Sequence, residues 1–257
     1  MRNGRGVYQF PDKTENDLTV KSIYMGYWEN NIKHGVGSYI WRKYPKDQEE
    51  KYENCQITAF VGWFYKDNYD VGMFYEERVN DLTVYYGTFE GNKKHDKEGF
   101  FYHNSIEETY VVVCDIDDDF VFEGIKFVFS HDEESNKNNF IDYIEFKYNT
   151  ETHENLREGS DIEKMPNDIK EKYKKAQDFI DLLFKEEDFD KIYKAAIDGE
   201  VSHKGIDSIE IFNQKFVSSL KNYCSEGSIK LDNKLRDKFP KEGKFKYLKD
   251  KIGRAHV

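Results

Sequence analysis

The sequence of 257 residues contains few prolines, few cysteines and no long apolar run. The three cysteines, Cys55, Cys114 and Cys224, are far apart and form no CxxC pair, which argues against a zinc site and is typical of a reducing compartment. No run of about 18 apolar residues is present, so we expect no transmembrane helix. The first residues, MRNGRGVYQF, lack the apolar core of a signal peptide, and we expect a cytoplasmic protein.

The motifs of common enzyme classes are also missing. The sequence has no H-x-x-x-H pattern, no G-x-S-x-G pattern and no P-loop. His34 and His95 take matching places in a repeat described below, which indicates a structural role such as a turn hydrogen bond. We therefore expect no cofactor, no catalytic residue and no enzymatic activity from these residues.

The net charge of −11 is placed unevenly along the chain. Residues 1–150 hold 17 basic and 28 acidic side chains, whereas residues 151–257 hold 22 of each, so the first part carries the whole excess. An acidic surface repels phosphate groups, which argues against nucleic acid as a partner. The same charge disfavours a phosphoinositide membrane, because attachment to anionic lipid needs clustered Lys and Arg.

Aromatic residues, in contrast, are abundant, with 19 Tyr, 20 Phe and 3 Trp. Rings in such numbers favour β-strands. The most regular stretch is YMGYWENNIKHGVGSYIW, residues 24–41, where two alternating runs flank Asn30 and Asn31. This pattern predicts a β-hairpin with a polar turn. Its fixed positions are Tyr24, Gly26, Trp28, His34, Gly35, Gly37 and Tyr39.

The same pattern recurs less regularly along the first 150 residues. Residues 2–10 match the second half of the hairpin, since Gly4 and Gly6 correspond to Gly35 and Gly37. Two further units are predicted at residues 60–75, with a turn at Asp67-Asn68, and at residues 85–102, with a turn at Gly91-Asn92. Their repeat positions are Gly62, Phe64, Gly72, Gly87, Phe89 and Gly99.

These positions resemble the MORN repeat, whose pattern is roughly Y-x-G-x-W-x-N-G-x-x-H-G-x-G-x-Y. Asn31 stands where the family prefers Gly, and Asn tolerates a positive φ. The resemblance covers residues 2–130 and implies stacked antiparallel hairpins. It also implies a role in cytoskeletal, ciliary or membrane-associated assemblies, with reported contacts to phosphoinositides. In some lipid kinases and in a lysine methyltransferase, such arrays precede a catalytic domain.

Elementary packing supports the same architecture. A single hairpin is marginal in water, whereas stacked hairpins extend one sheet. Gly26, Gly35 and Gly37 lack a Cβ, so a ring from a neighbouring strand can lie over their backbone. We therefore predict a twisted, curved ribbon with one face lined by rings and the other face acidic.

The pattern changes after residue 150. Residues 151–165 are polar and predicted as a linker. Apolar residues at steps of three and four then predict a helix over residues 168–185, followed by helices over 187–198, 207–223 and 231–239. The last residues, 252–257, resemble a translated sequencing adapter, so we expect the natural chain to extend further. The fold class is α+β: a MORN-like β-repeat domain at 1–150, then an α-helical domain at 166–251.

Two short motifs suggest chemistry. Residues 111–120 resemble the D-x-D loop of haloacid-dehalogenase-like phosphatases, with Asp115 and Asp117 as the acidic pair, although a solvated acidic turn fits the surrounding β pattern better. Residues 134–146 resemble an EF-hand loop, with Glu134, Asn136, Asn138, Asp142 and Glu145 as calcium ligands. A turn followed by a strand is the alternative there, so no metal site is predicted beyond this candidate.

Together these features predict a non-enzymatic scaffold or adaptor that assembles with protein partners and has homodimerisation as an option. Two alternatives stay open at this point. The chain could be the regulatory N-terminal part of a larger enzyme, such as a lipid kinase or a lysine methyltransferase, or it could be a calcium-binding module.

Overall fold

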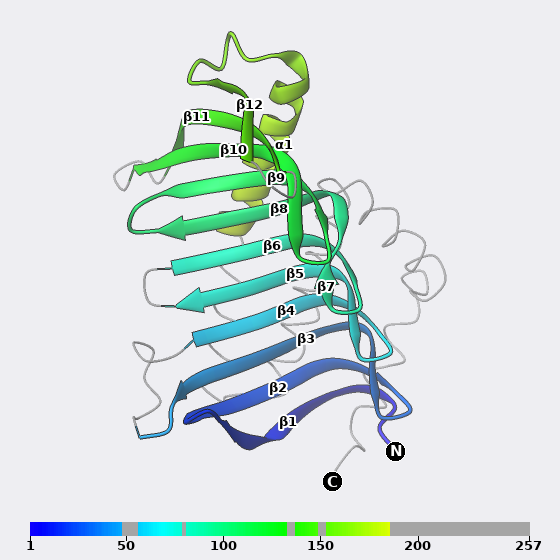
Figure 1. Cartoon of the computed structure of the whole chain (residues 1–257). Helices are drawn as coiled ribbons and strands as arrows, with labels where there is room; N and C mark the ends of the chain where they lie inside the picture. Colours follow the sequence, from blue (N-terminus) through cyan, green and yellow to red (C-terminus); the bar gives the residue numbers. More distant parts are fainter. Residues whose placement is uncertain (48–55, 79–80, 133–136, 149–152, 186–257) are drawn as a thin grey trace.

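A computed structural model describes residues 1–47, 56–78, 81–132, 137–148 and 153–185 (Figure 1). These residues form one large antiparallel sheet and one helix. The strands are β1 (Gly4–Glu15), β2 (Leu18–Glu29), β3 (Ile32–Pro45), β4 (Gln56–Tyr65), β5 (Asn68–Arg78), β6 (Asp81–Glu90), β7 (Lys93–Lys94), β8 (Asp96–Ser105), β9 (Thr109–Asp117), β10 (Phe120–Asp132), β11 (Lys137–Tyr148) and β12 (His153–Gly159). The helix is α1 (Asn167–Lys185).

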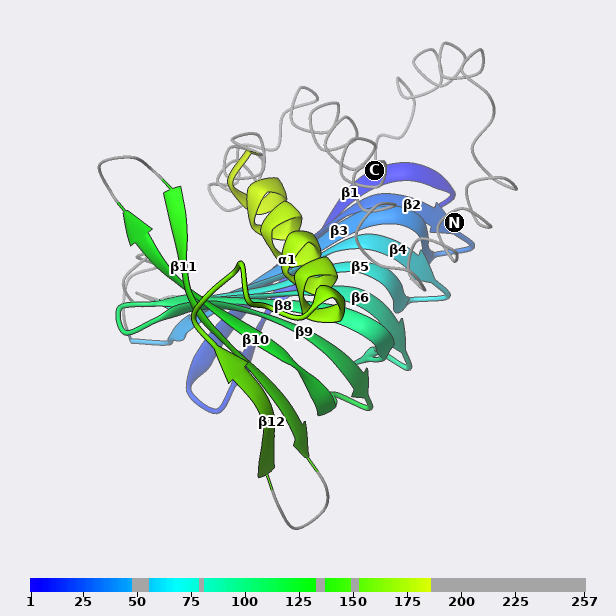
Figure 2. The same ribbon diagram turned by 90° about the horizontal axis from the view of Figure 1, so that it is seen from above.

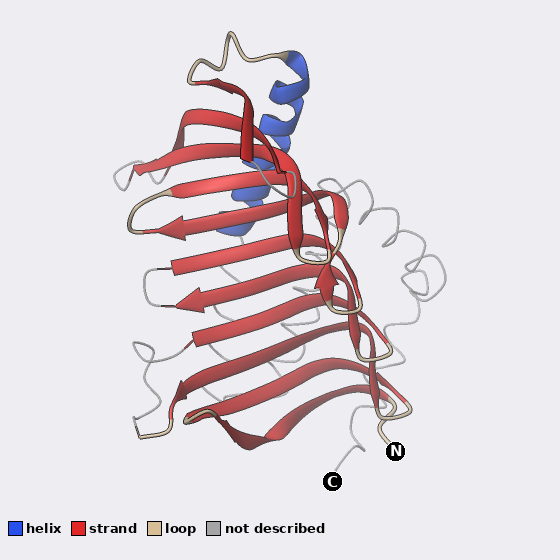
Figure 3. Cartoon of the chain, viewed as in Figure 1, coloured by secondary structure: helices blue, strands red, loops and turns tan. Residues whose placement is uncertain are grey.

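The sheet is a meander in which the strands lie in chain order from β1 to β12, and the short β7 pairs only with β6. Figure 3 shows that strands make up nearly all of the described regular structure. The predicted antiparallel ribbon of hairpins is therefore confirmed. The class α+β holds only approximately, because the described part of the chain is mostly strand with a single helix.

The hairpin turns along one edge of the sheet share a backbone conformation. Both central residues have positive φ in the turns at Asn30-Asn31, Lys66-Asp67, Gly91-Asn92 and Asp118-Asp119. Two positive φ values mark the type I′ turn, whose twist matches that of the strands it joins. The turn that we predicted at Asp67-Asn68 lies one residue earlier, because Asn68 already belongs to β5.

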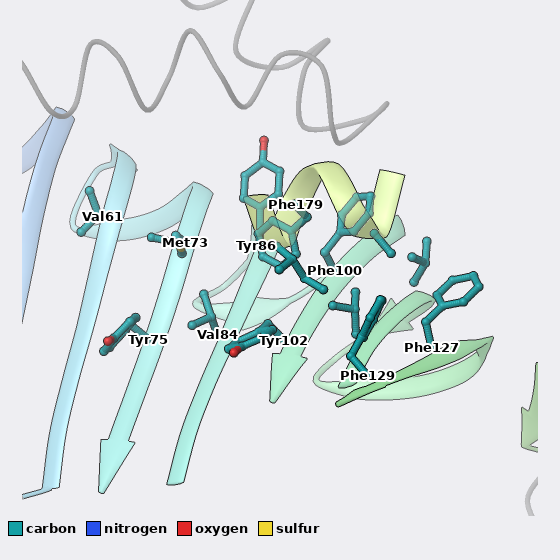
Figure 4. Packing of buried hydrophobic residues seen from close by; sticks show 14 of the residues in the cluster. Val61, Met73, Tyr75, Val84, Tyr86, Phe100, Tyr102, Phe127, Phe129 and Phe179 are labelled. Carbon is teal, nitrogen blue, oxygen red and sulfur yellow. The ribbon is translucent and has the colours of Figure 1, made fainter. Parts of the chain in front are cut away.

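The face of the sheet opposite the aromatic repeat positions carries the main hydrophobic core, from Met25 on β2 to Tyr143 on β11. Figure 2 shows that the strands are curved and that α1 lies along this face. Phe179 of α1 lies 5.4 Å from Phe100 and 6.1 Å from Tyr86, measured between ring centroids (Figure 4). Tyr173 packs in the same way on β10. The helix therefore closes the core over β6 and β8–β10. The face opposite the rings, which we predicted to be acidic, is thus apolar, and that prediction is wrong.

The structure departs from our prediction between residues 151 and 165. His153–Gly159, which we placed in a linker, form the last strand, β12, and pair with β11. Arg157 holds this strand to its surroundings through the carboxylates of Glu145 and Asp168. The strand was missed because its sequence, HENLREG, has almost no apolar residue for a pattern to detect.

The helix predicted at residues 168–185 is confirmed as α1, with a boundary shift of one residue. The helices predicted over 187–198, 207–223 and 231–239, and the tail 252–257, lie outside the described residues. The division into two domains therefore stays a prediction. Among the described helical residues, none form a segment long and apolar enough to cross a membrane.

A row of rings beside a line of glycines

The repeat glycines lie directly opposite one another across the first six strands. Strand pairing places Gly6 opposite Gly26, and the line continues through each neighbouring strand. Its full membership is Gly6, Gly26, Gly37, Gly62, Gly72 and Gly87. We call this set the glycine line. The units recur irregularly in the sequence, but the glycine line shows that they share one register.

Side chains from neighbouring positions fill the space above the glycine line. A Cβ built on Gly37 would lie 2.5 Å from Tyr24 Oη, and one on Gly87 would lie 2.3 Å from Tyr85 Oη. At Gly62 the obstacle is backbone, because a Cβ would lie 2.3 Å from the Val71 carbonyl oxygen. Real Cβ contacts are longer than this, so only glycine fits. The predicted nesting of rings over small residues is present.

A second register line, two residues away, contains only rings over seven strands. It runs through Tyr8, Tyr24, Tyr39, Phe60, Phe74, Tyr85 and Phe101. The rings alternate in exposure. Tyr24, Phe60 and Tyr85, from the first strand of each hairpin, are at most 1% exposed. Tyr8, Tyr39, Phe74 and Phe101, from the second strands, are half-buried. We call these four the ring row.

Hydrogen bonds hold two of the buried rings in place. Tyr24 Oη donates to the Tyr27 carbonyl oxygen at 2.9 Å, and Tyr85 Oη donates to the Thr88 carbonyl oxygen at 3.0 Å. The two bonds are equivalent, since each spans three residues. Burial, and next the negative charge of Asp67, raise the pKa of the Tyr24 hydroxyl, so it stays protonated and can donate.

The remaining predicted ring positions support the buried rings. Trp28 lies 4.9 Å from Tyr24, Phe64 lies 5.0 Å from Phe60, and Phe89 lies 5.2 Å from Tyr85, each edge to face. Aromatic pairs of this geometry add about 0.5–1.5 kcal/mol beyond their burial. Each hairpin therefore carries its own aromatic pair.

Each of the four turns at Asn30-Asn31, Lys66-Asp67, Gly91-Asn92 and Asp118-Asp119 is also clamped to the preceding repeat. The N–H of Asp67 donates to the Lys33 carbonyl at 2.9 Å, and Asp67 Oδ1 accepts from the Lys33 N–H at 2.8 Å. Asp119 makes the same two bonds with Lys94. Asn31 binds Arg2 likewise, and Asn92 Oδ1 accepts from the Tyr69 N–H. The second turn residue is thus Asn or Asp because its side chain accepts a hydrogen bond.

This clamp places a donor side chain beside the ring row in each repeat. Lys33 Nζ lies 4.9 Å from the centre of the Tyr39 ring, and Lys94 Nζ lies 5.1 Å from that of Phe74. The Arg2 guanidinium lies 4.1 Å from the Tyr8 ring centre. Tyr69 takes the equivalent position in the middle repeat. The positive charges of Arg2, Lys33 and Lys94 are attracted by the ring faces. We did not identify these three residues from the sequence.

The positions of Lys33 and Lys94 could have been found from the sequence. Each lies two residues after a turn, directly before His34 or His95. His34 is buried, with Nε2 at 3.5 Å from Glu29 Oε2. His95 Nδ1 lies 2.7 Å from Asp117 Oδ1. Both histidines bind carboxylates at the turn edge, which agrees with the structural role that we predicted. Gly35 has a φ of 70°, a backbone conformation that favours glycine.

The acidic pair proposed from the D-x-D pattern does not form a phosphatase site in this sheet. Asp115 lies on β9 at 3.9 Å from Lys97, and Asp117 is bound to His95 beside the Asp118-Asp119 turn. A run of strands surrounds both, so the parallel α/β framework of such phosphatases is missing from the described residues. Asp115 and Asp117 lie on β9, and the acidic turn of the alternative prediction is formed by Asp118 and Asp119.

The calcium candidate also lacks the geometry of an EF-hand loop. Glu134 and Asn136 lie outside the described residues, and Asn138 belongs to β11. Asp142 is paired opposite Val128, whereas Glu145 is paired opposite Ile125, on the other face of the strand. The carboxylates of Asp142 and Glu145 cannot converge on one ion. No group of three metal-binding side chains occurs among the described residues.

A cavity of about 140 Å³ lies near the start of α1 and is lined by residues of β8–β12. Each of its carboxylates has a basic partner. Glu98 binds Lys175 at 2.8 Å, and Glu123 binds Lys147 at 2.7 Å. Asp115 and Glu145 are paired with Lys97 and Arg157. The negative charges in the cavity are therefore balanced by ion pairs, and the cavity is not the candidate site.

Comparison with known families gives one result for this chain. The family model of the MORN repeat matches residues 1–15 and 24–44, which contain β1 and most of the hairpin β2–β3. A search of curated proteins found no match. The units at 60–75 and 85–102 lie outside the matched residues, although their glycines and rings continue the same register lines. The chain thus contains MORN repeats, which are matched at residues 1–15 and 24–44.

Proposed function

We propose that this protein is a non-enzymatic scaffold or adaptor that binds a protein partner along the ring row. MORN repeats generally bind proteins or membranes. The observation that carries the proposal is the continuous row of half-buried rings on one face of the sheet. Aromatic side chains that are neither fully buried nor isolated are typical of binding surfaces.

The charge of the repeats favours a protein over an anionic membrane. The lysines beside the rings are already paired, since Lys33 Nζ lies 3.5 Å from Asp67 Oδ1 and Lys94 Nζ lies 3.6 Å from Asp119 Oδ1. Residues 1–150 as a whole carry 11 more acidic than basic side chains. Anionic lipid would be repelled by this excess. A cytoskeletal, ciliary or membrane-associated assembly remains the proposed setting.

The test compares three forms of the full chain as bait in an extract of the source organism. One carries Phe74→Leu and Phe101→Leu, which keep apolar volume but remove the flat ring faces. The control carries Phe120→Ala and Phe122→Ala, two rings that are 63% and 44% exposed outside the ring row. We expect a partner that is retained by the wild type and by the control but lost from the ring-row variant.

The same three forms are then sedimented with vesicles of neutral lipid and of neutral lipid containing phosphoinositide. Vesicle binding that depends on the ring row, without any protein that does, would overturn the proposal in favour of a membrane. Capture that is equal for all three forms would show that the ring row is not the binding surface. Circular dichroism of each form confirms that the sheet is intact.

A further inference from the structure

The ring row has a fixed period that is set by the sheet. Tyr39 and Phe74 are separated by one strand, and so are Phe74 and Phe101. Neighbouring strands lie about 4.7–4.9 Å apart, so successive rings of the row recur about every 9.4–9.8 Å. Tyr8 extends the row by one more step at the β1 end. A ligand that used all four rings would need the same repeat.

Three cations that can donate hydrogen bonds lie close to the rings of the row. Arg2, Lys33 and Lys94 lie beside Tyr8, Tyr39 and Phe74, respectively. The lysines are not fully covered, since the side chain of Lys33 is 17% exposed and that of Lys94 is 20% exposed. The surface therefore combines four flat rings with three donors, which suits a ligand with a regular series of acceptors.

The period distinguishes between the three regular conformations of a peptide. A polyproline II helix advances about 3.1 Å per residue and has three residues per turn, which gives a repeat of about 9.3 Å. The mismatch to the ring row is about 0.1–0.5 Å per step. An α-helix returns to the same face after seven residues, or about 10.5 Å. Its mismatch to the ring row would add up to about 2–3 Å over three steps. In a β-strand, side chains on one face recur about every 6.7 Å, which does not match the period of the ring row.

Polyproline II also satisfies the chemistry of the donors. Its backbone makes no internal hydrogen bonds, so its carbonyl oxygens are free to accept. Recognition of proline-rich segments by other domains uses aromatic-lined surfaces in the same way, because the ligand is already ordered before it binds. The right-handed twist of the sheet limits the match to a few repeats. The four rings of the row fall within that range.

We propose that the ring row binds a proline-rich segment in the polyproline II conformation, running across the strands with a proline at every third residue. The inference rests on the proposed function and names the class of partner for the same surface. Basic side chains between the prolines fit the acidic excess of the repeats, so the favoured segment is P-x-x-P-x-x-P with Lys or Arg at some intervening positions.

The test measures binding of synthetic peptides to the full chain by fluorescence anisotropy. The first peptide carries proline at every third residue, with alanine and lysine between. The second has the same composition but proline at every fourth residue. We expect binding of the first peptide to be about tenfold tighter, and Phe74→Ala in the protein to reduce it by about tenfold or more. The control variant Phe122→Ala should bind like the wild type.

Because Phe74 is half-buried, a second variant separates binding from folding. Phe74→Leu keeps an apolar side chain and should preserve the sheet while still weakening the first peptide. Equal binding of the two peptides, or binding that Phe74→Leu and Phe74→Ala leave unchanged, would overturn the inference. If neither peptide binds while a protein from the extract still depends on the ring row, the inference fails and the proposed function stands.

Discussion

The two ends of the sheet bury their apolar surface in different ways. From β1 to β8, the rings of one register line fold over glycines of the next, and the sheet packs against its own side chains. From β9 to β11, the ring line continues as Val112, Lys126 and Ile144, which are not rings. On the opposite face, α1 contacts β8, β9 and β10. A repeat thus stabilises the first end, whereas a helix stabilises the second.

The two ends of the sheet tolerate different substitutions. Ring-over-glycine packing requires a missing Cβ at many positions, and this makes the pattern visible in the sequence. Helix packing requires only apolar volume at the right places, which many residues provide. The repeat end can therefore leave its second-strand rings half-buried, while the helix end uses its rings for its own core. Substitutions at the two ends should therefore differ in their effects.

Removing a core ring of α1 should have the largest effect, at the helix end. Phe179 is fully buried against Tyr86 and Phe100. Phe179→Ala is expected to lower the free energy of unfolding by about 3–5 kcal/mol, because a cavity replaces the ring. Urea unfolding followed by tryptophan fluorescence measures it. The exposed Lys174→Ala on the same helix is the control, and equal midpoints for both variants would show that α1 does not hold the sheet.

Adding one methyl group at the repeat end should have the next largest effect. Gly62→Ala places a Cβ 2.3 Å from a backbone oxygen that cannot easily move, and we expect a loss of about 2–3 kcal/mol. Gly6→Ala is the matched control in the same glycine line, because its nearest neighbour, Trp28, would lie 3.8 Å away. Thermal unfolding of both variants measures the difference. Similar melting temperatures would mean that the glycine line is not a packing requirement.

The hydroxyl of a buried ring should contribute less than the ring itself. Tyr24→Phe removes the bond to the Tyr27 carbonyl and should lower the free energy of unfolding by about 1 kcal/mol at neutral pH. Phe60 occupies the equivalent place in the next hairpin without a hydroxyl, so the fold should persist. A loss as large as that of Gly62→Ala would contradict this ranking.

The same residue predicts a dependence on alkaline pH. The pKa of the Tyr24 hydroxyl is raised in the folded state above its ordinary value of 10.0, mainly by burial. Above pH 10.0 the unfolded chain therefore binds fewer protons than the folded chain, and stability falls as the pH rises. Tyr69 and Tyr102 add to the effect, for the same reason. Urea midpoints measured across this range should fall less steeply for Tyr24→Phe than for the wild type.

The smallest effect is expected at the turn clamp. Asp67→Gly retains a residue that adopts the φ of 68° but removes the acceptor for the Lys33 N–H. We expect a loss of about 0.5–1 kcal/mol, since the site is exposed. Asp17→Gly is a control, because Asp17 has a φ of 64° in the turn between β1 and β2 at the other edge. If chemical unfolding gives the same loss of stability for Asp67→Gly and Asp17→Gly, the positive φ alone accounts for the choice of residue at position 67.

Much of the repeat end could be predicted from the sequence. The hairpins, the turns at Asn30-Asn31 and Gly91-Asn92 and the nesting of rings over glycines follow from a pattern that repeats, so each unit confirms the others. At the helix end, α1 was found from its apolar stripe. β12 was not, because its only apolar side chain is that of Leu156. It forms a strand because β11 pairs with it and because Arg157 binds Glu145 and Asp168.

The candidate site divides in the same way. The rings and glycines were named from the sequence, but Lys33 and Lys94 were not. Their shared place directly before His34 and His95 is a signal in the sequence, but their position beside a ring depends on how successive hairpins stack. The substitution of Asn31 for the Gly that the family prefers was interpreted as tolerated. The structure shows that the Asn31 side chain accepts a hydrogen bond from Arg2, which glycine could not do.

The sequence by itself determined the local unit of this protein, a hairpin in which glycine leaves space for a ring. That follows because the absence of a Cβ and the alternation of side chains along a strand are local properties. Only the tertiary structure decided which rings are covered and which stay half-exposed. That choice depends on how successive hairpins pack against one another, as the alternation of Tyr24, Tyr39, Phe60 and Phe74 along one register line shows.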